Sequence, residues 1–457
     1  MELRLFDTYE RKLRVFSPLD ERKVKIYACG PTVYDHAHIG NLRTYLFEDL
    51  LKRTLIWNGY DVEHVINITD VGHLVSDGDE GEDKMEIGSK KSGMNAWELA
   101  DFYTKTFKQD LERLNILSPD IWCKATDHIP EQIAFIEDLE KKDFTYRLED
   151  GIYFDSRKLK SYGYLARLDI EGLKEGARVE AGDRRFLTDF ALWKFSPEHS
   201  TRQMEWDSPW GKGFPGWHIE CSAMSAKFLG DFFDIHCGGE DHIPVHHTNE
   251  IAQTEASRGT RLANFWMHGY FLRLDEAKMS KSSGTFLTLD ALEDKGFDPL
   301  VYRYFCLGGH YRTQISFTQD GLQAAQTSLN RLYELAFGWG EPGKIHGPTL
   351  DSIRSDLNDD LAMPKALATI WRMVKSNLEP SAKKATLLEF DKVLGLNIDQ
   401  WRPQKLDVPD KVRDLVKRRT QARRAKHWAE ADAIRQEISA LGYNIKDEGD
   451  ETTILPQ

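Results

Sequence analysis

One short pattern near the start of the chain limits its fold more than any other feature. Residues Val24 to Cys29 alternate apolar and polar side chains as a strand does, a Gly-Pro pair breaks the pattern, and a periodic segment from Leu42 to Trp57 follows. Val62 to Ile68 is a second apolar run. Two strands joined by a helix form a right-handed βαβ unit in nearly all cases. We therefore predict an α/β fold with a doubly wound parallel sheet of the Rossmann type.

The same pattern stops and later resumes. Residues from Phe144 to Pro197 contain short strand-like pieces, Gly151 to Phe154 and Phe186 to Trp193, separated by charged turns. Strand patterns return at Phe232 to His236 and at Phe265 to Leu272. We therefore predict that an insertion interrupts the sheet, because a domain tolerates an insertion in a surface connection.

The rest of the chain has helical spacing. Apolar residues recur at helical intervals over Leu322 to Leu335 and Leu361 to Val374, and Pro403 and Pro409 bracket a short linker. We predict an all-α helical C-terminal part that ends in a small domain. The predicted parts are the first half of the Rossmann domain at 1–120, an inserted connective region at 121–201, the second half at 202–262, a linking region at 263–318, a helical bundle at 319–402 and a small basic domain at 403–457.

Composition excludes several classes of protein. The chain has 457 residues, with 61 Lys and Arg against 74 Asp and Glu, which gives a net charge of −13. No run approaches the length of an apolar membrane span, and the first residues do not resemble a secretory signal, so we expect a cytoplasmic protein without membrane contact. The 5 cysteines are scattered, which favours thiols or metal ligands over a disulfide framework. An acidic chain needs a local basic patch to bind nucleic acid.

The loop after the first strand carries a candidate phosphate site. It reads CGPTVYDHAHIGN and places His36, His38, Gly40 and Asn41 at the start of the first helix. A helix N-terminus offers unpaired backbone donors and the positive end of its dipole to a phosphate, and a glycine permits close approach. The alternative is a glycine-containing turn with solvent-exposed histidines.

A second candidate site is the string KMSKS at Lys278 to Ser282. Lys278 and Lys281 can close onto a polyphosphate and neutralise the charge that develops as pyrophosphate leaves. For two lysines taken alone, a solvated charge run is the alternative reading.

Four side chains form a candidate metal site. His246 and Glu250 are i and i+4 on a helical pattern, so they share one face. Together with the thiolates of Cys29 and Cys221, they would suit zinc. The alternative is two buried thiols with an exposed His and Glu, since cysteine is often buried as a small hydrophobe.

The last segment reverses the charge of the chain. Between Lys411 and Lys426 there are eight basic residues and one acidic residue. We predict a helix whose cations point outward, with Trp428 nearby, which fits contact with an RNA backbone and stacking on unpaired bases. A solvated surface helix is the alternative.

The two candidate phosphate sites resemble the paired motifs of class I aminoacyl-tRNA synthetases. In addition, Cys29 in CGPTVYD, Trp217 in GWHIECSAM, and His246 with Glu250 in HHTNE resemble the pattern of the cysteinyl-tRNA synthetases. This resemblance implies ATP-dependent activation of L-cysteine to cysteinyl-adenylate and transfer to the 3′ end of tRNA(Cys). It also implies one Zn²⁺, held by Cys29, Cys221, His246 and Glu250, that selects the substrate thiolate, and Mg²⁺ with the ATP.

The resemblance also assigns roles to single residues. It makes the domain at 403–457 an anticodon-binding domain and the region at 263–318 a contact to the tRNA stem. Asn41 departs from the family, whose motif usually has a second histidine there. The implied residues are, for catalysis, His38, Asn41, Lys278 and Lys281; for ATP, His36, Gly40, His236, Gly238, Gly239, Asp241 and Lys281; for substrate cysteine, Thr69 and Trp217; and for tRNA, Arg418, Arg419, Arg423, Arg424 and Trp428.

Two other functions stay open at the level of sequence. A related ligase family activates cysteine on a similar zinc-containing core and passes it to an amino sugar, and it looks truncated where this chain carries its basic end. A non-catalytic binding paralogue would need a damaged site, and Asn41 is the one departure in that direction. For Asp241, a helix cap is the simpler alternative. We expect a monomer.

Overall fold

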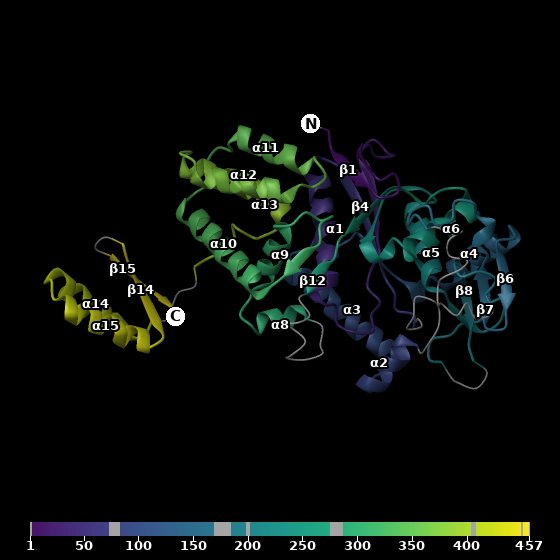
Figure 1. Ribbon diagram of the computed structural model, residues 1–457, viewed down its shortest axis with the longest axis horizontal. Helices are drawn as coiled ribbons and strands as arrows, with labels where there is room; N and C mark the ends of the chain where they lie inside the picture. The colour runs from purple at the N-terminus through teal and green to yellow at the C-terminus, as the bar shows by residue number, and fades with distance from the viewer. Residues whose placement is uncertain are drawn as a thin grey trace. The chain divides into compact units, whose positions relative to one another are not determined.

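The central strands form a five-stranded sheet in the order β11-β10-β3-β4-β5, and all of them are parallel (Figure 1). All residues of β10 are buried, as expected for a parallel sheet that is covered on both faces. These observations confirm the predicted Rossmann-type fold. The strands are β3 (Lys23–Ala28), β4 (Asp61–Ile68), β5 (Ile121–Lys124), β10 (Phe233–Gly239) and β11 (Ala263–Gly269).

The computed structural model describes residues 2–72, 83–168, 184–197, 202–274, 287–403, 408–448 and 451–456. The chain divides into two compact units, with the boundary between Asp399 and Gln400. None of the described helices is long and apolar enough to cross a membrane.

Helices cover both faces of the sheet. α1 follows β3 and packs against β4, β10 and β11, while α4, α5 and α6 pack against one another on the other side of the sheet in Figure 1. α2 and α3 lie between β4 and β5 in the chain. The helices of this region are α1 (Ile39–Trp57), α2 (Lys84–Ser92), α3 (Ala96–Arg113), α4 (Ile129–Lys141), α5 (Trp217–Leu229) and α6 (His246–Arg258).

The insertion forms its own antiparallel sheet, in the order β6-β7-β8-β9. β7 has the predicted bounds, but β8 begins at Phe190 instead of Phe186. The difference arises because the Asp189 amide donates to the Phe186 carbonyl at 3.1 Å, which makes this stretch a turn. The strands are β6 (Thr145–Leu148), β7 (Gly151–Phe154), β8 (Phe190–Phe195) and β9 (Gly213–Pro215).

Two short strand pairs lie outside the predicted pattern. An N-terminal hairpin of β1 (Arg4–Asp7) and β2 (Lys12–Val15) precedes the sheet. The prediction of one strand over Phe265 to Leu272 is wrong at its end, because β12 (Leu272–Leu274) is separate from β11 and pairs with β13 (Ile315–Phe317).

The remainder of the first unit is helical, as predicted. α9 contacts α1, and α13 contacts both α1 and α10, so this helical part packs directly on the first helix of the Rossmann fold. The helices are α8 (Leu289–Glu293), α9 (Pro299–Leu307), α10 (Gln319–Gly338), α11 (Gly347–Leu357), α12 (Met363–Lys375) and α13 (Pro380–Leu394).

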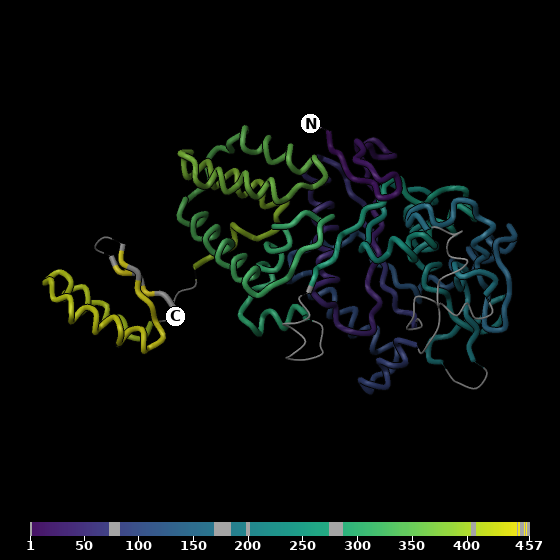
Figure 2. The backbone as a smooth tube through the Cα atoms, viewed as in Figure 1, coloured from purple at the N-terminus to yellow at the C-terminus, as the bar shows by residue number. Residues whose placement is uncertain are grey.

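The second unit pairs two helices with a hairpin (Figure 2). The basic segment forms α14 (Asp410–Arg424) and is followed by α15 (Trp428–Ala440). β14 (Tyr443–Glu448) and β15 (Glu451–Pro456) form the hairpin, which the sequence pattern does not predict. Its small apolar core contains Val412, Leu415, Ile434, Ile438 and Ile445.

A buried ionic cluster fixes α1 against the helical part of the first unit. The Asp49 carboxylate accepts from Arg53 Nε at 2.7 Å and from Arg303 Nη2 at 2.5 Å, and Arg303 is fully buried. Arg303 also donates to the carbonyls of Leu394 and Leu114, at 2.6 and 3.0 Å. Burial would raise the pKa of Asp49, but the two guanidinium groups hold it below its usual range.

We expect Asp49→Ala to lower the free energy of unfolding by about 3–5 kcal/mol, because it leaves two guanidinium groups buried without their partner. Urea unfolding followed by tryptophan fluorescence measures the change. The exposed pair of Arg4 and Asp359 provides the control, since Arg4→Ala should cost less than about 1 kcal/mol. Equal effects of the two substitutions would contradict the assigned role of Asp49.

The buried Asp49 carboxylate and its guanidinium partners also make the stability of the protein depend on pH. The pKa of Asp49 is lower in the folded chain than in the unfolded chain, so its contribution is complete above about pH 4 and is lost as the pH falls towards the folded value. The difference in stability between the parent protein and Asp49→Ala should therefore narrow in acid.

Candidate active site and metal centre

The candidate site lies at the point where the strand order reverses. Among the strands of this sheet β3 comes first in the chain, β4 and β5 follow on one side of it, and β10 and β11 lie on the other side. Ligands of open α/β sheets bind at this switch point, beyond the carboxyl ends of the strands. A cavity of about 290 Å³ lies there, lined by residues that include Cys29, His36, His38, Asn41, Tyr103, Trp217, Gly239, Asp241 and His242.

His38 and Asn41 cap the first helix. The Asn41 amide donates to His38 Nδ1 at 3.1 Å, and the His38 amide donates to Asn41 Oδ1 at 3.3 Å. The two residues thus form a capping box, in which each satisfies a backbone donor of the other. Gly40 leaves room for this arrangement, because a Cβ there would lie 2.9 Å from the His38 ring. Asn41 therefore has a structural role that suits an amide side chain.

The histidines of this loop line the cavity. Burial lowers the pKa of His38, although the nearby Asp241 opposes this shift, so the ring is neutral at neutral pH. His36 is exposed, and its ring centroid lies 5.0 Å from that of Tyr103 in an edge-to-face contact. A neutral imidazole and the N-terminus of α1 thus face the same cavity.

Four predicted metal ligands converge beside the cavity, whose lining includes one of them, Cys29. One donor atom from each of Cys29, Cys221, His246 and Glu250 can be chosen so that all four lie within 4.8 Å of one another, and all four residues are buried. His246 Nε2 is 3.0 Å from Glu250 Oε1, and Cys29 Sγ is 3.8 Å from the same oxygen. Two thiols, an imidazole and a carboxylate gathered in this way would suit a divalent ion of the zinc type.

Three further histidines contact this donor cluster. His218 Nδ1 lies 3.0 Å from His246 Nδ1, and His236 Nε2 lies 2.7 Å from Glu250 Oε2. His247 Nε2 lies 3.3 Å from Cys29 Sγ, and its Nδ1 lies 2.8 Å from His268. Such outer partners orient metal ligands and adjust their basicity.

The surroundings favour the metal-binding form of two of the four donors, Glu250 and Cys221. Burial would raise the pKa of Glu250, but His236 and His246 hold it below its usual range, so the carboxylate is ionised. A hydrogen bond from Cys29 lowers the pKa of Cys221 to about 7. A thiolate is the form of cysteine that binds a metal.

The start of α5 depends on a glycine. A Cβ at Gly216 would lie 2.0 Å from the Ala191 carbonyl of β8, so only glycine permits this approach. The helix that follows carries Trp217 into the cavity lining and Cys221 into the donor cluster. The Trp217 ring centroid lies 4.5 Å from that of His246.

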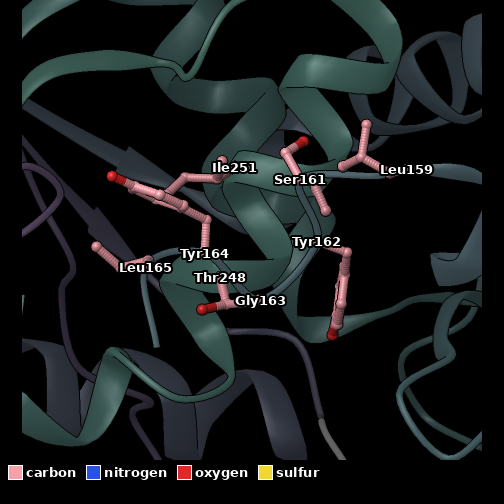
Figure 3. A pocket seen from close by; sticks show the side chains of 9 residues that line it. Leu159, Ser161, Tyr162, Gly163, Tyr164, Leu165, Thr248 and Ile251 are labelled. Atoms are coloured by element: carbon pink, nitrogen blue, oxygen red, sulfur yellow. The ribbon is translucent and has the colours of Figure 1, made fainter. Parts of the chain in front are cut away.

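The insertion holds α6 from outside. Figure 3 shows the segment from Leu159 to Leu165 against α6, with Thr248 and Ile251 on the helix side. The Tyr162 hydroxyl donates to Asn249 Oδ1 at 2.7 Å. The space between this segment and α6 cannot hold a water-sized molecule. The two therefore pack directly on each other, which fixes the helix that carries His246 and Glu250.

The predicted ATP contacts at the end of β10 and in the turn after it are divided between two regions. Gly239 and Asp241 line the cavity, and Asp241 lies inside the 3₁₀ turn Glu240–His242, whose N-cap is Gly239. Gly238 lies against His242 and His247, since a Cβ at this position would be 2.5 Å and 2.7 Å from their rings. His236 is fully buried against Glu250 and does not line the cavity, so its position differs from that implied for an ATP contact.

One other predicted residue, Thr69, has surroundings that the sequence does not reveal. Thr69 is buried, does not line the cavity and donates to Glu220 Oε2 at 3.1 Å. Lys278 and Lys281 lie outside the described residues.

The basic helix shows one clear difference from its predicted arrangement. Arg418 and Arg424 are exposed, and Trp428 is 60% exposed. Arg419 is instead buried and forms a bidentate ion pair with Asp447, at 2.8 and 2.7 Å. Arg423 contacts the same carboxylate at 2.7 Å. The prediction that all these cations point outward is therefore wrong for Arg419.

Sequence reasoning missed several site residues. The imidazoles of His218 and His247 stand next to predicted residues in GWHIEC and HHTNE, and that adjacency is the available signal. Lys84 and Tyr103 line the cavity, yet no motif marks them.

Comparisons with known proteins agree with this architecture. The family described as tRNA synthetases class I (C) catalytic domain matches residues 15–327, and the family described as cysteinyl-tRNA ligase anticodon binding domain matches residues 406–454. A cysteine–tRNA ligase 1 of Burkholderia lata is 59% identical over 98% of this chain and 95% of its own length. A cysteine–tRNA ligase of Zymomonas mobilis is 42% identical over 97% of this chain and 95% of its own length.

Solved structures support the fold. The Mycobacterium tuberculosis methionyl-tRNA synthetase in complex with methionyl-adenylate aligns with a TM-score of 0.57 at 15% identity, over 83% of this chain and 93% of that chain. At this identity the likeness concerns the fold alone. The two family matches and the full-length relatives show that the chain belongs to the cysteinyl-tRNA synthetase family of class I aminoacyl-tRNA synthetases.

Proposed function

We propose that the chain is a cysteine–tRNA ligase, which activates L-cysteine with ATP and transfers it to the 3′ end of tRNA(Cys). The observation that carries this proposal is the convergence of four buried donors beside a cavity at the sheet's switch point. Cys29 belongs to both the donor cluster and the cavity lining, so a ligand in the cavity can reach an ion held there.

The donor cluster supports Zn²⁺ as the resident ion, with Cys29, Cys221, His246 and Glu250 as its ligands. When bound, zinc would favour a thiolate over a hydroxyl, because a metal-bound thiol is deprotonated outright. Serine differs from cysteine at the atom that such an ion contacts. Apolar contacts discriminate such small differences weakly, so metal coordination is the effective source of selectivity.

Activation needs positioning more than proton transfer. The carboxylate of cysteine is ionised at neutral pH; its oxygen forms a bond to the α-phosphorus of ATP while the bond to the leaving pyrophosphate breaks. We assign His36, His38, Gly40 and the N-terminus of α1 to the phosphates, and Gly239 and Asp241 to the nucleoside. Lys278 and Lys281 would close over the pyrophosphate, and Mg²⁺ would accompany the ATP.

Transfer to tRNA involves the second unit. Its family match and the exposed Arg418, Arg424 and Trp428 support contact with RNA, whereas Arg419 acts within the unit through Asp447. The same match favours tRNA over an amino-sugar acceptor. A monomeric state, a cytoplasmic location and the domain boundaries stay predictions.

The first test measures which amino acid supports exchange of pyrophosphate into ATP. We expect exchange with cysteine, an at least 1,000-fold lower kcat/KM with serine (roughly 4 kcal/mol), and loss of cysteine-dependent exchange after metal removal. Restoring Zn²⁺ should restore activity. Exchange that is equally fast with serine, or unaffected by complete metal removal, would contradict the proposed selectivity.

A second test concerns the metal itself. Cys221→Ala should lower the bound zinc from about one equivalent per chain to well below it, as measured by elemental analysis, because the site would lose one of its two thiolate ligands. Cys306→Ala is the matched control, since Cys306 is also a buried free thiol but lies on α9. Full zinc content in Cys221→Ala would remove this residue from the ligand set.

A third test separates RNA contact from activation. Replacing both Arg418 and Arg424 by alanine should raise the KM for tRNA about tenfold, because two cations that neutralise phosphates of the RNA backbone are lost. Pyrophosphate exchange, which does not involve tRNA, should stay unchanged. Arg435→Ala, an exposed change on α15, is the control. An unchanged KM for tRNA in the double variant would refute the proposed interface.

A further inference from the structure

Lys84 is a cavity residue that none of the recognised motifs includes. It is the first residue of α2, and its side chain lines the same cavity as His38 and Asp241. Its Nζ lies 5.5 Å from the ring centroid of Tyr34 and 5.9 Å from that of Trp217. Contact with two aromatic rings holds an ammonium group at the cavity wall.

The charges of the side chains that line the cavity indicate which group Lys84 would bind. Among the lining residues that the structure describes, Lys84 is the only lysine or arginine, whereas Asp35 and Asp241 contribute carboxylates. An amino acid brings both an ammonium and a carboxylate group. The two aspartates suit the ammonium group, which leaves Lys84 as the side chain that suits the carboxylate.

The position of Lys84 fits the amino acid end of the cavity. The Trp217 ring contacts Lys84 and also lies 4.5 Å, between centroids, from the ring of the metal ligand His246. In cysteine only the β- and α-carbons separate the sulfur from the carboxyl group. A substrate whose sulfur is held at the donor cluster can therefore extend its carboxylate past Trp217 towards Lys84.

The start of α2 is anchored firmly enough for such a role. The Asp83 side chain accepts from the Met85 and Glu86 amides, at 2.7 and 3.1 Å, and forms an ion pair with Arg202. Met85 is buried. These contacts fix the helix end from which the Lys84 side chain extends.

We propose that Lys84 binds the α-carboxylate of the substrate cysteine and orients it for attack on ATP. This inference rests on the proposed function, because it takes cysteine as the substrate and its sulfur as the metal-bound atom. It adds a residue that determines recognition of the carboxylate, separate from the ions and donors that recognise the thiol.

The test compares two thiols that differ by the carboxylate. Isothermal titration of the zinc-loaded, full-length protein with L-cysteine and with cysteamine, which lacks the carboxyl group, gives a dissociation constant for each. For Lys84→Met we expect about 10- to 100-fold weaker binding of cysteine and no more than about a two-fold change for cysteamine. Lys84→Arg should recover most of the affinity for cysteine.

Lys91→Met is the matched control, because Lys91 is an exposed lysine of the same helix. It should change neither dissociation constant. Equal weakening of cysteine and cysteamine by Lys84→Met would show a structural effect and overturn the inference. So would unchanged cysteine binding; if the rate of pyrophosphate exchange then fell, the lysine would instead act on the α-phosphate.

These results can be separated from failure of the proposed function. The binding comparison does not depend on turnover. Absence of cysteine-dependent pyrophosphate exchange in the parent protein would contradict the ligase activity, whatever the two dissociation constants are.

Discussion

The site depends on one buried carboxylate, that of Glu250. An isolated ionised carboxylate is costly to bury, and here two imidazoles, those of His236 and His246, offset the cost from opposite oxygens. Because His236 belongs to β10 and Glu250 to α6, the contact between these two residues also fixes the helix against the strand. Cys29 at the end of β3 and Cys221 on α5 then complete a donor set in which every member comes from a rigid element or its immediate end.

The topology explains why an insertion is tolerated inside such a site. The chain leaves the sheet after β5 and returns at β10, which pairs with β3. The two halves of the sheet therefore meet at β3, and the strands of the insertion form a separate sheet. The insertion is more than a spacer, since the stretch around Tyr162 packs on α6 and β8 lies against Gly216. The donor cluster thus draws on residues from both halves of the fold and on support from the inserted sheet.

Much of this arrangement could be predicted from the sequence, and the failures have physical causes. Periodicity revealed the Rossmann strands because their burial is continuous, and i, i+4 spacing placed His246 and Glu250 on one face. Spacing could not bring Cys29 to Cys221, since their approach depends on strand order, and the resemblance to a family supplied that pairing. Arg419 reads as an outward cation because its partner, Asp447, lies on a hairpin that local pattern does not predict. Lys84 has no motif, and only the folded cavity reveals it.

The capping box at the start of α1 has a consequence for how the cavity receives a nucleotide. His38 and Asn41 occupy each other's backbone amides. In the proposed ATP complex, a phosphate oxygen that accepts a hydrogen bond from the Asn41 amide would release the His38 ring for a contact of its own. Binding of ATP would then exchange one acceptor for another at a preformed helix N-terminus, while the Asn41 side chain keeps its own backbone donor satisfied.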